Sequence, residues 1–350
     1  MVKEEIMSQF EDRKPGEKYL LIAAGSGPSN VTLPDGSITS AREIKKELGY
    51  PQLLAWMNEK KELLEWVEQL REDDELRKKI KLVVDSSAYS AWTRHIKVNI
   101  DEYIDFINSI SDVVYWFAEL DKIPGEFGKE KTEEQIKEAP EYSWKNFLYM
   151  IEKVNCPKKI LPIFHMYEDY KYLDNMLSYK FSDGSFIEYI GISPSNDASV
   201  NDKIKWYEKT WNYIFSRCKE LGRKIPMSHN FGCTTVSIME QFPSMSSDST
   251  SWVRSASFGN IMLVVNGKIK TVYVSDRNMN SPDHILNQPQ AIKDSVEKEC
   301  KRVGHGLTLN DLIYNDPKGQ YRSLFNLYSL SDWSDTFEYK GSQDFKEDLW

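Results

Sequence analysis

Residues 81–92 read KLVVDSSAYSAW, a short apolar run that ends abruptly in an aspartate and two serines. Leu82, Val83 and Val84 are aliphatic residues of the kind that fill a buried strand. Asp85 then places a carboxylate at the end of that strand, where a helix N-cap is the common explanation. The stretch predicts a buried strand and leaves open whether Asp85 caps a helix or takes part in chemistry.

Strand-like and helix-like segments alternate along the chain from residue 81 onward. Such alternation is typical of parallel strands joined by crossover helices. The expected strands cover residues 81–85, 112–121, 158–165, 186–193, 224–230 and 245–252. The expected helices cover residues 99–110, 131–155, 167–179, 199–222 and 233–241. Before this region, residues 18–30 predict a strand and loop, and residues 39–80 predict helices.

Each expected strand from residue 81 onward ends in an ionisable or hydroxyl side chain. These side chains are Asp85, Glu119 with Asp121, His165, Ser193, His229 and Asp248. In a (β/α)8 barrel the carboxyl ends of the strands converge on one mouth and supply the catalytic groups. A doubly wound sheet would instead predict a G-x-G-x-x-G loop, and residues 25–30, GSGPSN, do not match it. We therefore expect an α/β fold with a TIM-like (β/α)8 barrel over residues 1–255, including an N-terminal extension.

The pattern changes after residue 255. Residues 260–276, NIMLVVNGKIKTVYVSD, carry two apolar runs around Asn266-Gly267, which is a strong hairpin signal. A helix is expected over residues 288–303, followed by an acidic tail rich in Tyr and Ser that should pack loosely. The sequence thus predicts a second domain over residues 256–350, a hairpin and helical appendage packed on the barrel.

Composition excludes several classes of protein. The net charge of −9 argues against a broad basic face. No apolar stretch reaches the length of a membrane span, and the charged N-terminus lacks a signal-peptide core, so we expect a cytoplasmic protein with no membrane partner. The cysteines are far apart and form no C-x-x-C pair, so we expect buried free thiols and no metal or other cofactor. They are Cys156, Cys218, Cys233 and Cys300.

Six motifs in order carry a resemblance to a known family. They are VVDSSAYS, SDVVYWFAELDKIPG, LPIFHMYEDYKYLDNML, IEYIGIS, IPMSHNFG and SSDSTSW, within residues 80–255. This set resembles the tRNA-guanine transglycosylase superfamily, whose members are (β/α)8 barrels that exchange guanine for a 7-deazaguanine. The zinc-binding C-x-C-x-x-C insertion of the tRNA enzymes has no counterpart here. The chain is therefore more similar to the DNA-guanine transglycosylases of phages and bacterial genomic islands, which insert bases such as preQ0 and would act in the host cytoplasm.

The resemblance implies roles for individual residues. Asp85 looks like the general acid/base, and Asp248 looks like the nucleophile that attacks C1′ of the sugar. Asp121 is similar to the aspartate that accepts hydrogen bonds from the guanine edge. His165 stands where the family commonly has a base-contacting Gln. The remaining expected base contacts are Ser86, Tyr89, Ser193 and His229.

The nucleic-acid contacts are expected near the predicted mouth. Arg254, Lys268 and Lys270 are the candidates for phosphate contacts. The lysine-rich helix over residues 201–224 is interpreted as a solvated outer helix. Whether an accessory protein helps to bind the DNA is left open.

Three functions remain under consideration. The first is a transglycosylase that acts on DNA or, alternatively, on tRNA. The second is a glycoside hydrolase that uses Asp85 and Asp248 as its carboxylate pair. The third is a binding protein that keeps the barrel pocket without catalysis. The residues alone also permit the ordinary structural explanation for each group, a helix cap for an aspartate or a satisfied core position for a histidine.

Overall fold

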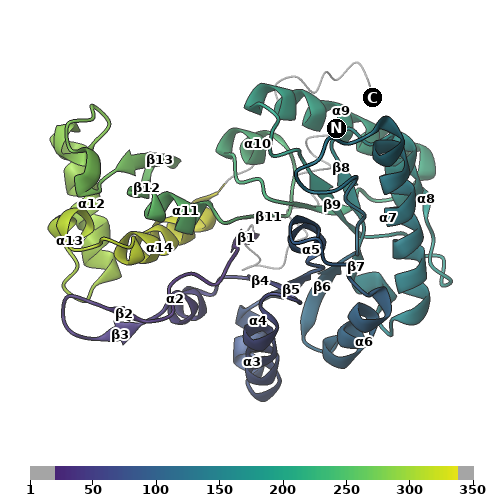
Figure 1. Ribbon diagram of the computed structural model, residues 1–350, viewed down its shortest axis with the longest axis horizontal. Helices are drawn as coiled ribbons and strands as arrows, with labels where there is room; N and C mark the ends of the chain where they lie inside the picture. Colours follow the sequence, from purple (N-terminus) through teal and green to yellow (C-terminus); the bar gives the residue numbers. More distant parts are fainter. Residues whose placement is uncertain (1–19, 338–350) are drawn as a thin grey trace. The chain divides into compact units, whose positions relative to one another are not determined.

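The computed structural model describes residues 20–337, so the N-terminal leader and the end of the tail lie outside the described residues. The described residues form two compact units (Figure 1). The first unit comprises residues 52–247, and the second combines residues 20–51 with residues 248–337. These units have other limits than the predicted domains 1–255 and 256–350, which stay a prediction.

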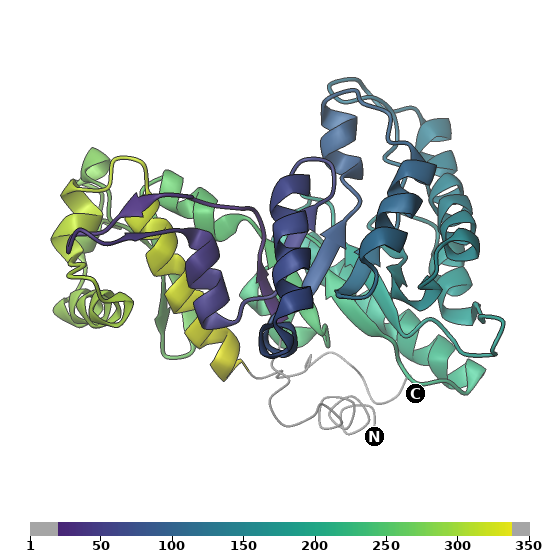
Figure 2. The ribbon, with the colours of Figure 1, turned by 90° about the horizontal axis from the view of Figure 1, so that it is seen from below.

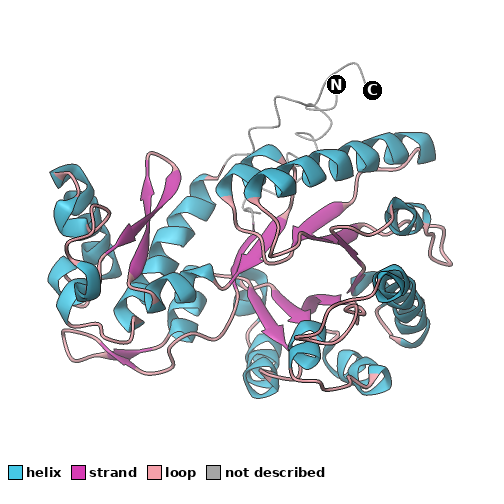
Figure 3. Ribbon diagram, turned by 45° about the horizontal axis from the view of Figure 1, so that its top comes forward, coloured by secondary structure: helices cyan, strands magenta, loops and turns pink. Residues whose placement is uncertain are grey.

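The first unit is built from parallel strands, drawn in magenta in Figure 3. Within its sheets these strands follow one another in chain order. One sheet has the order β4-β5-β6-β7, with β4 at Gln52–Ala55, β5 at Leu82–Asp85, β6 at Val114–Ala118 and β7 at Ile160–Leu161. The next sheet continues with β8 at Ile163–His165, β9 at Tyr189–Ser193, β10 at Met227–Asn230 and β11 at Ser246–Ser249, of which the first two residues belong to this unit. Only Pro162 separates β7 from β8, so one extended segment pairs first with β6 and then with β9. The expected α/β class with parallel strands is confirmed.

Helices follow most of these strands. They are α3 Lys60–Glu72, α4 Asp74–Lys79, α5 Ala88–Thr93, α6 Ile100–Ile110, α7 Glu133–Lys153, η1 Pro157–Lys159, α8 Tyr170–Ser178, α9 Val200–Leu221 and α10 Val236–Gln241. One face of the strands packs against the helices, where Val84, Phe117 and Phe164 share a buried core with Trp66 and Trp211. The predicted alternation from residue 81 onward is confirmed.

The prediction of continuous helices over residues 39–80 was wrong at β4. The segment QLLA follows Pro51 and pairs in parallel with β5. A four-residue apolar run cannot be assigned by periodicity, because it fits a buried strand and a helix turn equally well. Gly49, which ends the preceding helix in a left-handed conformation, marks the true boundary.

The wall of strands in the first unit curves. Trp116 of β6 contacts His229 of β10, with ring centroids 4.9 Å apart, although the two strands belong to different sheets and β7, β8 and β9 come between them. Phe231 packs on the same histidine at 4.5 Å and on Trp116 at 6.0 Å. Gly191 of β9 makes room for this ring, because a Cβ there would lie 2.6 Å from Phe231. The inner face of the curved wall is therefore filled by aromatic packing.

The second unit is assembled from both ends of the described chain. Its N-terminal part contains β1 Leu20–Ala23, β2 Val31–Thr32, β3 Ile38–Thr39 and α2 Ala41–Leu48. Its C-terminal part contains α11 Ser251–Ser257, β12 Asn260–Val265, β13 Lys268–Tyr273, η2 Asp276–Asn278, η3 Ile285–Asn287, α12 Gln290–Val303, α13 Leu309–Tyr314 and α14 Gln320–Thr336. The predicted hairpin is confirmed, because Asn266 and Gly267 join β12 to β13 with positive φ angles of 52° and 74°. Residues 251–252, expected to end a strand, instead begin α11.

The expectation of a loosely packed tail was wrong for the part that the structure describes. Helix α14 lies beside α2 in the centre of the second unit (Figure 2). Arg322 is 3% exposed and donates to the backbone carbonyls of Ala256, Leu312 and Asp316. Residues on most faces of this helix are buried. Its sequence therefore lacks the division into a polar and an apolar face that would predict a packed helix.

Replacing Gly191 by Ala should destabilise the first unit. The new methyl group would overlap the Phe231 ring, which is held between Trp116 and His229, and overpacking of this kind costs about 1–3 kcal/mol. Urea unfolding measures the loss. In a double-mutant cycle with Phe231→Leu, the two changes should couple by at least about 0.5 kcal/mol. Additive effects of the two changes would contradict the contact.

Candidate functional site

A histidine between two carboxylates lies at the carboxyl ends of the strands in the first unit. The Nε2 atom of His165 lies 3.3 Å from Oδ2 of Asp121, and its Nδ1 atom lies 3.2 Å from Oε1 of Glu168. The backbone N–H of His165 also donates to Oε2 of Glu168 at 3.0 Å. The three side chains are 12–30% exposed, so a ligand can reach them while bulk water is largely excluded. We call them the Asp121–His165–Glu168 cluster.

The local sequence HMYED explains how this cluster forms. Strand β8 ends at His165, and the chain turns at Tyr167, which has a left-handed φ of 79°. This turn brings Glu168 back to the histidine before Asp169 caps α8. The sequence predicted Asp121 and His165 as site residues and missed Glu168. An H-x-x-E spacing directly before a helix cap is the signal that would have found it.

The two carboxylates set the charge of His165. Burial of the imidazole disfavours its protonated form, but the negative charges and hydrogen bonds of Glu168 and Asp121 outweigh that effect. Together they raise the pKa of His165 well above 6.5. The imidazolium then donates from both ring nitrogens, one to each carboxylate.

A third carboxyl group lies behind the cluster. Glu119 follows β6, is fully buried, and accepts the backbone N–H of Ile163 at 2.7 Å through Oε1. Its Oε2 has no hydrogen-bond partner among the described residues. Burial, opposed by the Ile163 N–H and reinforced by the charge of Asp121, raises the pKa of Glu119 well above 4.5. Burial therefore favours the protonated form of Glu119, which the sequence identified only as a strand-end residue.

Asp85 ends β5, the strand next to β6, so it lies at the same edge of the sheet as Asp121. Its Oδ1 accepts the backbone N–H of Ser87 at 2.7 Å. Ser87 itself has a left-handed φ of 62°, which is the conformation that glycine would adopt more easily. The Ser87 hydroxyl accepts the backbone N–H of Met57 at 3.2 Å, so this serine is occupied within the turn.

Ser86 is also built into the turn. It is 1% exposed, its carbonyl accepts the Nε1–H of Trp56 at 2.8 Å, and its hydroxyl accepts the backbone N–H of Ala88 at 3.4 Å. These contacts give Ser86 a structural role in the turn, and its predicted contact with a base stays a prediction.

Tyr103 lies close to both predicted acid groups. Its hydroxyl donates to the carbonyl of Ala118 at 2.9 Å. Burial, and after it the negative charges of Asp85 and Asp121, raise the pKa of this phenol well above 10.0. The same phenol senses both aspartates, which supports their placement at one end of the first unit.

The other predicted residues are divided between the two units. Ser193 pairs with His165 in the β8–β9 ladder and so lies at the same sheet edge. His229 is fully buried, with its Nδ1 atom 2.7 Å from the Ser246 hydroxyl, and it belongs to the aromatic packing of the wall. Asp248 is the first residue of the second unit, directly after Ser247. Arg254, Lys268 and Lys270 also belong to the second unit, where Lys270 donates to Gln288 at 3.1 Å.

Exposed aromatic side chains flank the ends of β5 and β6. Tyr89 is 59% exposed, and its ring centroid lies 5.8 Å from that of Trp92. Phe127 is 46% exposed, and its ring centroid lies 5.2 Å from that of the same tryptophan. The Lys131 ammonium lies 5.2 Å from the Trp92 ring centroid. Such a surface suits a flat ligand, in line with the prediction for Tyr89.

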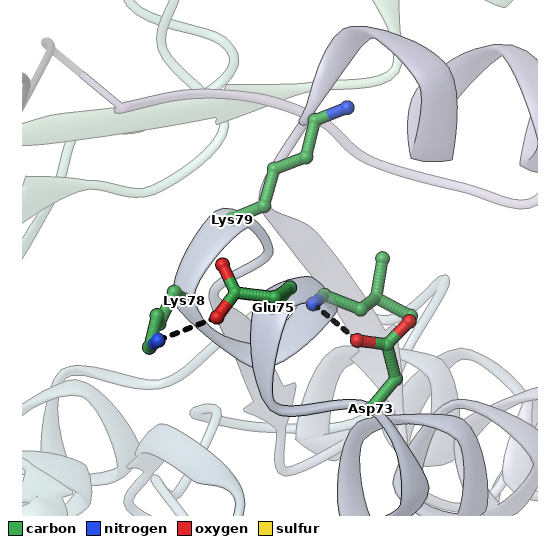
Figure 4. A pocket seen from close by; sticks show the side chains of 5 residues that line it. Asp73, Glu75, Lys78 and Lys79 are labelled. Atoms are coloured by element: carbon green, nitrogen blue, oxygen red, sulfur yellow. Dashed lines mark hydrogen bonds and ion pairs between the residues drawn. The ribbon is translucent and has the colours of Figure 1, made fainter.

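The concave regions that can be described on the first unit include one at α4 and one beside Glu168. One is a shallow depression at α4, where Leu76 N–H donates to Asp73 and Lys78 pairs with Glu75 at 2.6 Å (Figure 4). The helix cap and a surface ion pair account for its polar groups, so it offers no functional site. The other has a volume of about 790 Å³ and adjoins the cluster at Glu168. It is lined by Met166, Tyr167, Glu168, Asp169, Tyr170, Asp202, Lys205, Trp206 and Lys209.

Within residues 20–337, no group of three or more His, Cys, Asp or Glu side chains is arranged to hold a metal ion. The cysteines are free; three are buried as predicted, and Cys156 is half-buried. No helix in this part of the chain has the length and apolar character needed to cross a membrane. No protein-family model matches the chain, and no curated protein matches it either.

The stability of the Glu119→Gln variant relative to the wild type should increase as the pH rises. The raised pKa means that the folded chain keeps this proton above pH 4.5, where the unfolded chain releases it. The contribution of Glu119 to stability is thus full below 4.5 and is lost at higher pH, and the variant removes that loss. The free energy of unfolding of the variant, relative to the wild type, should rise by up to about 1.4 kcal/mol per pH unit.

Urea unfolding between about pH 5 and about pH 8 measures this difference. The exposed Glu130→Gln variant controls for removing a carboxylate in general. A stability difference that does not change with pH would contradict the buried, protonated Glu119.

The His165 imidazole should titrate above pH 6.5 in a proton NMR experiment, with its resonance assigned by its absence in His165→Gln. Glu168→Gln should lower the midpoint, because it removes one of the two carboxylates that stabilise the imidazolium. Glu130→Gln should leave the midpoint unchanged. A wild-type midpoint at or below pH 6.5 would contradict the claim that Asp121 and Glu168 raise the pKa of His165.

Proposed function

We propose that the chain is a pentosyltransferase that exchanges guanine in nucleic acid, with DNA favoured, for a 7-deazaguanine base. In this proposal its parallel strands belong to a TIM-like barrel of the guanine transglycosylase type. The observation that carries it is the Asp121–His165–Glu168 cluster at the carboxyl ends of the strands, beside Asp85 on the neighbouring strand. A carboxylate paired with a histidine can read the polar edge of a base.

The cluster supports base recognition by the hydrogen bonds that it offers. Asp121 accepts one hydrogen bond from His165 through Oδ2, which leaves acceptor capacity on the same carboxylate. The N1–H and exocyclic amine of a guanine-like ring are the matching donors. Glu168 holds the imidazole from its other side, so the histidine cannot turn away when a base arrives. Tyr89 and Trp92 supply aromatic surface for the flat ring.

The proposed reaction has two steps. The Asp248 carboxylate attacks C1′, the bond from C1′ to the base nitrogen breaks, and the electron pair leaves with the guanine, which takes a proton from Asp85. An incoming 7-deazaguanine then gives its ring N–H proton to Asp85, and its nitrogen attacks C1′ and displaces Asp248. The proton count and the number of glycosidic bonds are unchanged over the cycle, so no cofactor is needed.

The test is incorporation of labelled guanine or preQ0 into duplex DNA and, in parallel, into tRNA. We expect incorporation into DNA, with a loss of at least about 100-fold in Asp85→Asn and in Asp248→Asn. Asp248→Asn should also abolish any covalent adduct between protein and DNA. The control is Asp105→Asn, which removes an exposed aspartate of α6.

Each other outcome has a definite meaning. Incorporation into tRNA alone would replace DNA as the substrate. Release of guanine without incorporation would make the chain a hydrolase. No reaction with either polymer would refute the proposal.

A further inference from the structure

The pocket beside Glu168 has the chemistry of a nucleotide site. We infer that it holds the nucleotide of a DNA strand that adjoins the target nucleotide, with its phosphate on Lys205 and Lys209 and its base on Tyr167. This inference rests on the proposed function and adds to it a second binding site for the DNA strand. The pocket belongs entirely to the first unit and has a volume of about 790 Å³.

The two lysines are the available cations of this pocket. Lys205 and Lys209 stand four residues apart on α9, so they share one face of the helix, and both are exposed. Neither has an ion-pair partner among the residues that the structure describes. The Lys209 ammonium lies 4.5 Å from the Tyr170 ring centroid, and the Tyr170 hydroxyl lies 3.1 Å from Oγ1 of Thr210. Lys209 is thus held in place before any phosphate arrives.

The carboxylates around the pocket are already engaged. Glu168 binds His165 through both of its oxygens, and Asp169 caps α8. Asp202 accepts the hydroxyl of Ser199 at 2.7 Å at the start of α9. Hydrogen bonds hold Asp169 and Asp202 in place, and the imidazolium of His165 offsets the charge of Glu168. Lys205 and Lys209 are therefore the groups of the lining that can contact a phosphate.

Tyr167 supplies the aromatic surface. Its side chain is 70% exposed, and its backbone adopts a left-handed φ of 79°, which is unfavourable for a residue with a Cβ. An exposed aromatic ring on a strained turn at the rim of a pocket suits the stacking of a base. A free phosphate ion would make no use of it, whereas a nucleotide uses both the ring and the lysines.

The position of the pocket sets which nucleotide it holds. Glu168 lines the pocket and also binds His165, so the pocket and the cluster share a wall. A polymer whose target base meets Asp121 and His165 would therefore place an adjacent nucleotide here. From the sequence, this lysine-rich helix is expected to be a solvated outer helix. The predicted phosphate contacts, Arg254, Lys268 and Lys270, belong to the second unit instead.

Binding of a fluorescently labelled single-stranded DNA oligonucleotide, measured by anisotropy, tests the inference. We expect Lys205→Gln with Lys209→Gln to weaken binding by at least about 10-fold and to reduce the salt dependence by one to two phosphate contacts. Tyr167→Ala should weaken it by about 10-fold with the salt dependence unchanged. The matched controls are Lys219→Gln on the same helix and Tyr142→Ala on α7, both exposed and neither part of the pocket lining, and they should bind like the wild type.

Base incorporation by the same variants separates this inference from the proposed function. If the wild type incorporates the base and the pocket variants bind DNA like Lys219→Gln, the inference is refuted and the proposed function stands. If the pocket variants lose DNA binding while the wild type incorporates no base, the pocket is a nucleotide site, and the proposed function and the assignment to a target-adjacent nucleotide both fall. Preferential loss of tRNA binding in a parallel arm would overturn the assignment to DNA. Circular dichroism confirms that each variant is folded, and the two single lysine variants replace the double one if it is not.

Discussion

The wall of strands in the first unit depends on the change of pairing partner at Pro162. The segment 160–165 pairs with β6 before this proline and with β9 after it, and the proline itself has no N–H to donate. Its carbonyl accepts the N–H of Gly191, and the buried Glu119 side chain accepts the N–H of Ile163, so the backbone groups at the change of partner are satisfied. A protonated acid is the natural acceptor here, because a charged one would have to remain desolvated.

The same passage places the candidate site. His165 lies three residues beyond Pro162, at the end of the short β8, and Glu119 lies two residues before Asp121. The buried acid Glu119 and the two cluster residues Asp121 and His165 are thus parts of one local arrangement. The pairing of β8 with β9 fixes the backbone of His165, and Glu168 then fixes its ring. Rigid support of this kind is what a site for a flat, polar ligand requires.

The fold class and much of the candidate site could be predicted from the sequence. The alternation of apolar runs with helical periodicity, and the polar residues that end the strands, identified Asp85, Asp121 and His165. These signals are local, so a single sequence carries them. The chemical function of these residues was predicted by resemblance, and it stays a prediction.

The sequence did not identify what depends on contacts between distant segments. β4 was missed because a strand of four residues has no period of its own, and α14 was missed because a helix buried on most sides shows little contrast between its faces. Glu168 was missed because its role arises from a turn at a tyrosine with positive φ. His229 was expected at the mouth, and the curvature of the wall instead encloses it between Trp116 and Phe231.

The discontinuity of the second unit bears on how the protein is made. Its N-terminal part, residues 20–51, packs with α14, and the hydroxyl of Tyr50 donates to the carbonyl of Leu327 at 2.6 Å. A ribosome delivers residues 52–247 between these two partners. Residues 52–247 of the first unit are therefore available before α14, while the apolar side chains of the N-terminal segment stay uncovered until that helix emerges. A chain released before residue 320 would contain residues 52–247 of the first unit and would lack α14 of the second.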